Sequence, residues 1–286
     1  MPIRLLITDA MWDRIEPLMP ADPVRGRRWA DHRRTLEAIA WKYRTNSPWR
    51  DLPDELGPFQ TAHKRLIRWA VDGTWEMILA SVLAAADADD DIDWTVSVDS
   101  TVVRAHQHAG GARKKGRLAP GEPADHALGR SRGGLSTKVH LAADGGARPL
   151  AFTVTAGQAG DAPAFERVMS HIRVPRNGPG RPRTRPLAVL ADRAYSSRAI
   201  RSYLRRRGIR TVIPQPSDQI SHRLRRGRNG GRPPGFDRDA YKQRNTVERC
   251  INRLKQWRGL ATRTDKLAIA YQAALHLAGI LIWTRR

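Results

Sequence analysis

The sequence predicts an α/β fold: a mixed five-stranded sheet flanked by helices, preceded by a small all-α domain. Residues 1–90 show helical periodicity and contain no strand-type run. After the acidic linker at residues 86–93, β-branched runs of alternating pattern begin. Three such runs follow one another directly, and the later ones alternate with helical segments. Successive strands followed by strand and helix alternation are typical of a mixed sheet with helices on its faces.

The N-terminal region, residues 1–90, is predicted to bind DNA. A capped helix, a turn-rich connector and a basic helix suggest a helix-turn-helix type of domain, in which Lys64, Arg65 and Arg68 would contact DNA. A plain helical bundle with a solvated basic face is equally consistent with this pattern. Six of the nine tryptophans lie in this region and are expected to anchor its core.

The second region, residues 91–286, is predicted to hold the sheet. Its C-terminal apolar segment, residues 267–283, is expected to be a buried core helix, because it is short for a membrane span and contains Gln272 and His276. The five expected strands are TVSVDSTVVRA (95–105), STKVHLAAD (136–144), RPLAFTVTA (148–156), PLAVLAD (186–192) and RTVIP (210–214).

The charge of the chain indicates a polyanionic partner. Lys and Arg number 51 against 28 Asp and Glu, which leaves a formal net charge of +23. Nucleic acid is the first candidate for such a partner, and we expect double-stranded DNA and no membrane. The single cysteine, Cys250, excludes an intramolecular disulfide and favours a reducing, cytoplasmic location.

Three basic segments are predicted to be irregular. Residues 106–134 and 222–239 are rich in Gly and Arg, lack an apolar period, and are expected to form long basic loops. In residues 178–186 a Gly-Arg-Pro sequence could place Arg181 in a minor groove. Solvated loops are the alternative for each segment taken alone, whereas three basic loops around one sheet favour contact with phosphates.

Three carboxylates are candidate metal ligands. Asp99 lies inside an apolar strand, where an ion is costly without a partner, and Asp192 ends the fourth strand, where ligand sites in open α/β sheets tend to lie. Glu248 is the single acid of the basic segment at residues 240–257. Hard oxygen ligands of this kind suit Mg²⁺ or Mn²⁺, and two such ions about 4 Å apart support phosphodiester chemistry.

Glu248 belongs to a stripe of four residues on one predicted helix. At about 100 degrees per residue, Tyr241, Arg244, Glu248 and Lys255 share one face, beside the buried face of Val247, Ile251 and Leu254. An ordinary ion pair between Arg244 and Glu248 would explain only two of the four. The stripe therefore favours a site at which Arg244 and Lys255 hold phosphates beside the metal ligand.

The stripe resembles the Y-R-E-K signature of transposases encoded by bacterial insertion sequences. The segments VDSTVVRAHQHA, LGRSRGGLSTKVHLAADG, TAGQAGDAPAF and ADRAYSSRAIRSYLRRRG are also similar to those enzymes, as is SPWRDLPDELGPFQTAHKRLIRWAVDGTW. The resemblance covers residues 8–286 and is specific to the insertion-sequence family conventionally numbered five. It implies a ribonuclease-H-like catalytic domain and a DDE triad of Asp99, Asp192 and Glu248.

The resemblance also implies a DNA transposase that uses two Mg²⁺ or Mn²⁺ ions. It would cleave DNA at terminal inverted repeats and transfer the element to target DNA. Pairing two element ends implies a homodimer or higher assembly, and the resemblance implies a bacterial protein of the cytoplasm that is associated with the nucleoid. The short interval between Asp192 and Glu248 argues against a large inserted β-domain. Two alternatives remain open: a nuclease of the same fold, and a non-enzymatic DNA-binding protein derived from a transposase.

Overall fold

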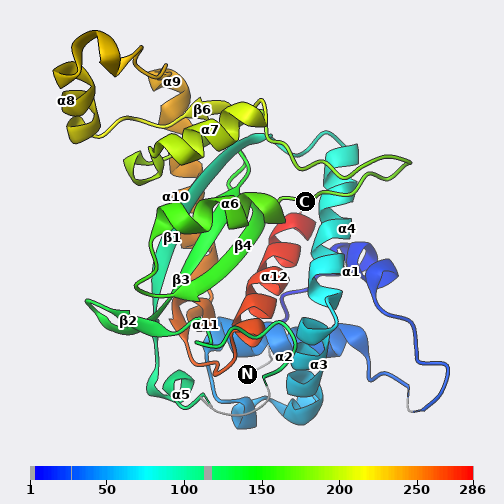
Figure 1. Ribbon diagram of the computed structural model, residues 1–286. Coiled ribbons are helices and arrows are strands. Elements are labelled where there is room, and N and C mark those ends of the chain that lie inside the picture. Colours follow the sequence, from blue (N-terminus) through cyan, green and yellow to red (C-terminus); the bar gives the residue numbers. More distant parts are fainter. Residues whose placement is uncertain (1–3, 27, 113–117, 286) are drawn as a thin grey trace.

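The five predicted strands are all present in the computed structural model, which describes residues 4–26, 28–112 and 118–285 (Figure 1). Two short strands, β2 and β7, extend the sheet to seven strands. The strands are β1 (Thr95–Ala105), β2 (Gly129–Ser131), β3 (Gly134–Ala143), β4 (Pro149–Ala156), β5 (Ala188–Ala191), β6 (Arg210–Val212) and β7 (Thr262–Arg263).

The sheet is mixed, with β1 at its centre. Strand β1 pairs antiparallel with β3 and parallel with β5, while β3 pairs antiparallel with β4 and β5 pairs parallel with β6. An antiparallel meander of three strands, followed by two parallel strands on the other side of the first, is the ribonuclease-H-like arrangement that the sequence predicted. Because β1 lies between β3 and β5, residues in its middle are flanked on both sides.

Helices cover both faces of the sheet. Side chains alternate along β1, so Ser97 and Asp99 face one side and Ser100 faces the other. Thr246 of α10 donates a hydrogen bond to Ser97, and Asp161 of α6 accepts one from Ser100, which places α10 and α6 on opposite faces (Figure 1). The helices of this part are α5 (Gln107–Gly110), α6 (Asp161–His171), α7 (Arg198–Arg206), α8 (Ser217–Arg225), α9 (Arg238–Tyr241), α10 (Asn245–Lys255), α11 (Arg258–Ala261) and α12 (Ala268–Thr284).

The apolar C-terminal helix α12 is buried along its length, as predicted. It packs against β4 on one side and against the N-terminal helices on the other. Within the described part of the chain, no helix is both long and apolar enough to cross a membrane. The N-terminal helices are α1 (Asp9–Ile15), α2 (His32–Thr45), α3 (Phe59–Val71) and α4 (Thr74–Ala88).

The N-terminal helices share one hydrophobic core with the sheet. Buried residues form a continuous cluster from Ile7 to Trp283, because α2, α3 and α4 bury their apolar faces on α12. Helix α4 ends at Ala88 and β1 begins at Thr95, on either side of the predicted boundary at residue 90. The division into two separate domains, residues 1–90 and 91–286, stays a prediction; residues 1–3, 27 and 286 lie outside the described residues.

The connector between α2 and α3 is longer than a helix-turn-helix turn. It runs from residue 46 to residue 58 and contains the 3₁₀ turns η2 (Trp49–Asp51) and η3 (Asp54–Leu56). The tight turn lies instead between α3 and α4, where Gly73 has φ +79°, a left-handed conformation that glycine adopts without strain. The connector before the basic helix α3 is therefore turn-rich, as predicted, and the tight turn follows that helix.

The predicted basic loops are partly regular. Residues 106–134 contain α5 and β2, and residues 222–239 contain the end of α8, a 3₁₀ turn at Gly227–Gly230 and the start of α9. Residues 113–117 of the first loop lie outside the described residues.

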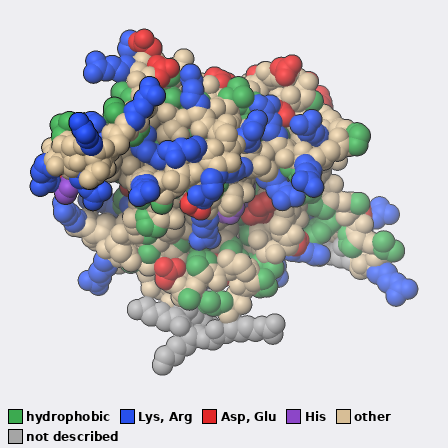
Figure 2. All heavy atoms as spheres, turned by 45° about the horizontal axis from the view of Figure 1, so that its top comes forward, with side chains coloured by type: hydrophobic (Ala, Val, Ile, Leu, Met, Phe, Trp, Pro, Cys, Tyr) green, Lys and Arg blue, Asp and Glu red, His purple; other side chains and the backbone are tan. Residues whose placement is uncertain are grey.

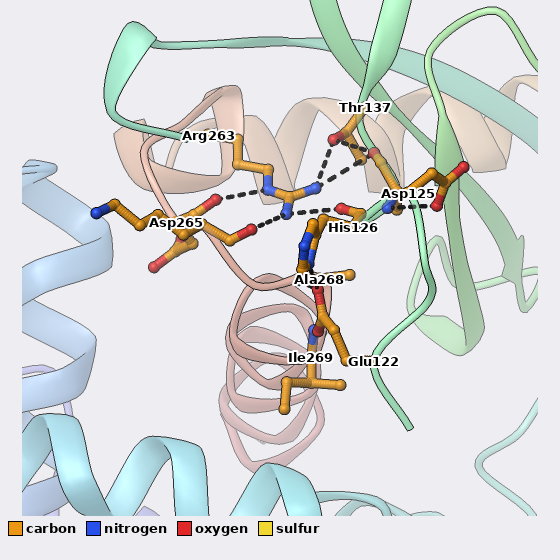
Figure 3. A network of polar contacts seen from close by, with 10 residues as sticks. Glu122, Asp125, His126, Thr137, Arg263, Asp265, Ala268 and Ile269 are labelled. Carbon is orange, nitrogen blue, oxygen red and sulfur yellow. Dashed lines mark hydrogen bonds and ion pairs between the residues drawn. The ribbon is translucent and has the colours of Figure 1, made fainter. Parts of the chain in front are cut away.

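The end of the first predicted loop is fixed to the start of α12 (Figure 3). Glu122 is buried, and its two carboxylate oxygens accept hydrogen bonds from Ala268 N at 2.8 Å and Ile269 N at 3.0 Å. His126 lies 2.5 Å from the same carboxylate. Arg263, also buried, donates to Thr137 Oγ1 and to the carbonyl of His126. Glu122 thus satisfies free N–H groups at the N-terminus of α12.

Replacing Glu122 with alanine is expected to lower the free energy of unfolding by about 2–4 kcal/mol, because buried N–H groups and a buried histidine would lose their partner. Urea denaturation followed by circular dichroism would measure the change. Glu166→Ala, at an exposed position of α6, is the matched control and should change stability by less than about 0.5 kcal/mol. Equal effects of the two substitutions would contradict the capping role.

Candidate active site

Asp99 and Asp192 lie side by side on neighbouring parallel strands. Val98 of β1 pairs with Ala191 of β5, so Asp99 and Asp192 are the next residues along the two strands. Asp192 follows the last residue of β5 and caps the 3₁₀ turn η4 (Arg193–Tyr195), where its Oδ1 accepts a hydrogen bond from Ala194 N at 2.8 Å. Both carboxylates therefore lie at the carboxyl edge of β5, where open α/β sheets place their sites.

Glu248 is brought to Asp99 by Arg244. The guanidinium of Arg244 donates to Asp99 Oδ2 at 3.1 Å and, through its other terminal nitrogen, to Glu248 Oε1. The side chains of Arg244 and Asp99 are 20% and 22% exposed, and that of Glu248 is 47% exposed. Arg244 thus forms the i, i+4 ion pair with Glu248 that is common on helix surfaces. The same guanidinium also pairs with Asp99 of β1.

The electrostatics of this group favour a cation. Burial raises the pKa of Asp99 above its usual value, and the charge of Asp192 raises it further, against the hydrogen bond from Ser100 N and the charge of Arg244. Burial alone would lower the pKa of Arg244, but Glu248 and Asp99 raise it above its usual value. Asp99 is therefore a mostly buried carboxylate that the positive charge of Arg244 stabilises.

The donor chemistry of the three carboxylates fits a hard divalent ion. In the described parts of the chain, no three His, Cys, Asp or Glu side chains are close enough together to hold a metal ion. Two of the three carboxylates converge on one cationic group, the guanidinium of Arg244, and the third is the register neighbour of Asp99.

The predicted helix that carries the stripe is interrupted. The 3₁₀ turn η6 (Lys242–Arg244) separates α9 from α10, so the expectation of one continuous helix over residues 240–257 is wrong. Tyr241 packs against Ala188, Leu190 and Val212 of the parallel strands. Lys255 is half-buried, and burial lowers its pKa. The predicted apolar face, together with Cys250, is buried: Val247, Cys250, Ile251 and Leu254.

The basic residues of α3 differ in their availability. Lys64 and Arg68 are exposed, whereas Arg65 is 4% exposed. The guanidinium of Arg65 stacks on the rings of Trp29, at 4.1 Å, and Trp69, and it bonds to His32 Nδ1 at 2.9 Å. The expectation that Arg65 contacts DNA is therefore corrected: its side chain holds the aromatic core of the N-terminal region.

Arg181 lies away from the carboxylates. It is exposed on the segment before β5, and it lines a cavity of about 770 Å³ together with Arg176, Arg183 and Arg185. Because Asp192 follows the end of β5, the arginine-rich cavity lies toward the opposite edge of that strand. On the face of the molecule that is drawn in Figure 2, Lys and Arg side chains are spread widely, with few acids among them.

Two polar residues beside the carboxylates were not singled out from the sequence. Asp161, the first residue of α6, accepts hydrogen bonds from Ser100 Oγ at 2.6 Å and Lys138 Nζ at 3.0 Å. Tyr195, at the end of η4, is buried, and its hydroxyl lies close to the Ser100 side chain. The acid in TAGQAGDAPAF and the tyrosine in ADRAYSS fall inside segments that carried the resemblance, and that was the available signal.

A ribonuclease-H-like sheet with acids at the paired edge of β1 and β5 and a basic helix beside them defines a nucleic-acid-processing enzyme. Comparison with known families identifies which one. The family model described as "Transposase DDE domain" matches residues 91–283, and that described as "Putative transposase of IS4/5 family" matches residues 7–79. The chain belongs to the DDE transposases, the enzymes of insertion-sequence transposition that cleave DNA and transfer strands.

Individual relatives carry the same description. The "Putative transposase for insertion sequence element IS402" of Burkholderia cepacia is 32% identical over 60% of this chain and 71% of its own length. The "Putative transposase for insertion sequence element IS6501" of Brucella ovis is 27% identical over 53% of this chain and 100% of its own length. The solved Mos1 transposase paired-end complex with left transposon end aligns over 84% of this chain and 82% of that chain, with 13% identity and a TM-score of 0.24.

Proposed function

We propose that this transposase uses Asp99, Asp192 and Glu248 to hold two divalent ions, Mg²⁺ or Mn²⁺, and cuts DNA at the terminal inverted repeats of its own element. The register of β1 and β5, which makes Asp99 and Asp192 neighbours, is the observation that carries this proposal. Bound ions of this kind activate an attacking oxygen and stabilise a leaving oxygen in phosphodiester chemistry. Asp99 and Asp192 are assigned as principal ligands and Glu248 as the ligand that completes the set.

The reaction would proceed in two displacements at phosphorus. In the first, water attacks the phosphodiester at the element end, the P–O3′ bond breaks, and a 3′-OH and a 5′-phosphate result. In the second, that 3′ oxygen attacks a target phosphodiester, a new P–O bond forms, and the target 3′ oxygen leaves with a proton. Arg244, the cation between Asp99 and Glu248, and Lys255, the last residue of α10, would hold the phosphates.

The DNA would extend from the carboxylates across the basic surface. Lys64 and Arg68 of α3 and Arg181 before β5 are exposed cations and are proposed to contact the duplex backbone. Tyr241 stays a predicted DNA contact, and its packing on Leu190 also supports the turn that carries Arg244. Bringing two element ends together calls for a homodimer or higher assembly, acting on the nucleoid in the cytoplasm.

The contribution of α3 to DNA binding has a salt signature. Lys64→Ala combined with Arg68→Ala is expected to weaken binding to all duplexes alike and to reduce the slope of log K against log salt by about 2, since each phosphate contact contributes about 0.9. Fluorescence anisotropy between low and moderate salt would measure the slope. Arg285→Ala, an exposed arginine at the C-terminus, is the control and should leave the slope unchanged. An unchanged slope in the double variant would remove α3 from the interface.

The proposed activity is tested by incubating the purified full chain with DNA that bears the inverted repeats flanking its own gene, a supercoiled target plasmid and Mg²⁺. End cleavage together with joined products is expected, and chelation of the metal should abolish both. Cleavage without joining would indicate a nuclease. Binding without either product would contradict the proposal.

A further inference from the structure

Residues 214–237 form an arm that projects outward from the sheet beyond β6 and α9 (Figure 1). The arm consists of α8, the 3₁₀ turn η5 (Gly227–Gly230) and the segment that leads to α9. None of its residues is buried, so the hydrophobic core does not include it. The surface of the arm is therefore available for a partner.

The arm is folded and fixed at its base. A side chain at Gly230 would lie 2.1 Å from the carbonyl oxygen of Arg223, so η5 packs closely on α8 and requires glycine at that position. At the base, the hydroxyl of Ser196 donates a hydrogen bond to Gln219 Oε1 of α8 at 3.0 Å. Ser196 is buried directly after η4, the turn that Asp192 caps. This bond connects the arm to the turn beside the candidate metal ligand.

Both ends of the arm lie at the edge of the sheet that carries the carboxylates. Strand β6 pairs in parallel with β5. Pro214, two residues beyond β6, and Asp192, directly beyond β5, therefore leave the sheet at the same edge. At its other end, the arm leads through α9 into η6, whose last residue, Arg244, donates to Asp99. A partner bound to the arm would thus lie beside the proposed active site.

The surface of the arm is cationic. Between residues 217 and 236 the only acid is Asp218, and the basic residues apart from His222 are Arg223, Arg225, Arg226, Arg228 and Arg232. All of these arginines except the half-buried Arg223 are exposed. Like charges gathered on one segment repel one another, and an anionic partner removes that repulsion. The arm therefore fits a polyanion.

The apolar surface of the arm is too small to hold a second copy of the chain. Ile220 and Leu224, neighbours on one face of α8, are 37% and 64% exposed. Two side chains provide far less than the roughly 800 Å² per partner that a stable protein interface buries. Charge therefore decides the partner, and the phosphates of DNA are the anions that the proposed reaction brings to this edge of the sheet.

We propose that the arm grips the element-end DNA beside the scissile phosphate, with Arg225, Arg226 and Arg228 on backbone phosphates within about one helical turn of the cut. This inference rests on the proposed function, which places the scissile phosphate at the carboxylates. The nine residues of α8 span about 14 Å, less than the roughly 34 Å of one turn of duplex. The contact is therefore local to the site, whereas α3 lies at the other end of the molecule (Figure 1).

The first test is the triple variant Arg225→Ala, Arg226→Ala, Arg228→Ala in the full chain. The slope of log K against log salt for end DNA should fall by about 2–3, since each phosphate contact contributes about 0.9. Hydroxyl-radical footprinting should show protection lost beside the cut, at positions that Lys64→Ala with Arg68→Ala leaves protected. The affinity for Mn²⁺, measured by electron paramagnetic resonance without DNA, should not change. An unchanged slope and footprint would overturn the inference.

The second test places the arm on the DNA directly. Cys250 is buried, so an iron chelate that reacts with thiols will label Ser221→Cys, at an exposed position of α8, in preference to the natural cysteine. The chelate should cut end DNA within about one helical turn of the bond that the protein itself cleaves with Mg²⁺. Ser170→Cys, exposed on α6 across the sheet from α10, is the control and should not cut there. The same cuts from both positions, or cuts only at distant positions, would contradict the proposed contact.

The outcomes distinguish the inference from the proposed function. End cleavage by the wild type, with full DNA affinity and footprint in the triple variant, would overturn the role of the arm and leave the proposed function intact. End DNA that is bound but never cut by the wild type would overturn the proposed function, while a reduced slope in the triple variant would still support the arm as a DNA contact. Loss of self-association in size-exclusion chromatography, with DNA affinity unchanged, would identify a second copy as the partner and overturn the inference.

Discussion

Replacing Asp99 with asparagine is expected to reduce cleavage at the element ends by about 10³-fold or more. The substitution removes the negative charge of a proposed metal ligand, and a bound divalent ion contributes several kcal/mol to the stabilisation of the transition state. The substitution keeps the shape of the side chain and the hydrogen bond that Asp99 Oδ1 accepts from Ser100 N. DNA affinity should therefore stay near that of the wild type. Single-turnover cleavage of labelled end DNA, with binding measured in parallel, gives both quantities.

The matched control is Asp13→Asn, an exposed aspartate on α1 that has no role in the proposed site. It should cleave at the wild-type rate. Retained cleavage in Asp99→Asn would remove Asp99 from the catalytic set. A parallel loss of DNA binding would show that the carboxylate acts on the fold or on the interface instead.

Replacing Arg244 with alanine is expected to have the second largest effect. Arg244 is the cation between Asp99 and Glu248, so its loss leaves two carboxylates without their partner. Without metal, the variant should be less stable than the wild type by about 1–3 kcal/mol, the cost of breaking a partly buried ion pair, discounted for the exposure of Glu248. Added Mg²⁺ should raise its melting temperature more than that of the wild type, because an ion then supplies the missing charge.

Cleavage by Arg244→Ala should still fall about 10²-fold at saturating Mg²⁺, because a planar donor that holds phosphate is lost. Arg244→Lys should recover less than the conserved charge suggests, since one ammonium cannot bridge two carboxylates as a guanidinium does. Arg249→Ala, at an exposed position of α10, is the control. Differential scanning fluorimetry with and without Mg²⁺ measures the rise in melting temperature that the ion causes. A smaller rise in Arg244→Ala than in the wild type would contradict the proposed exchange of Arg244 for a metal ion.

The sheet could be predicted because its signals are local. Each of the five main strands is a β-branched or apolar run bounded by turn residues, and the acid at the end of β5 follows directly from that pattern. The two-residue strand β7 has no such signal, because it forms only where the chain after α11 meets the end of β1. The buried position of α12 was predictable from its apolar length alone.

The roles of single polar residues were less predictable, because they depend on partners far away in the chain. Arg65 has the sequence signature of a DNA contact, and its burial is explained by the positions of Trp29, Trp69 and His32. Glu122 lies in a segment without apolar period, yet it caps a helix that begins at Ala268. Tyr195 and Asp161 meet at Ser100, the chain neighbour of Asp99, through the packing of η4 and α6, and the spacing of these residues in the sequence does not predict this.

The measurement that tests the central claim most directly is cleavage of the protein backbone by added Fe²⁺ bound at the proposed metal site. Fe²⁺ replaces Mg²⁺ at oxygen-ligand sites, and with ascorbate and peroxide it produces radicals that cut the nearby backbone. The account predicts fragments that end near residues 99, 192 and 248, suppressed by excess Mg²⁺ and absent in Asp192→Ala. Cutting elsewhere, or cutting that Asp192→Ala does not change, would contradict the convergence of the three carboxylates on one metal site.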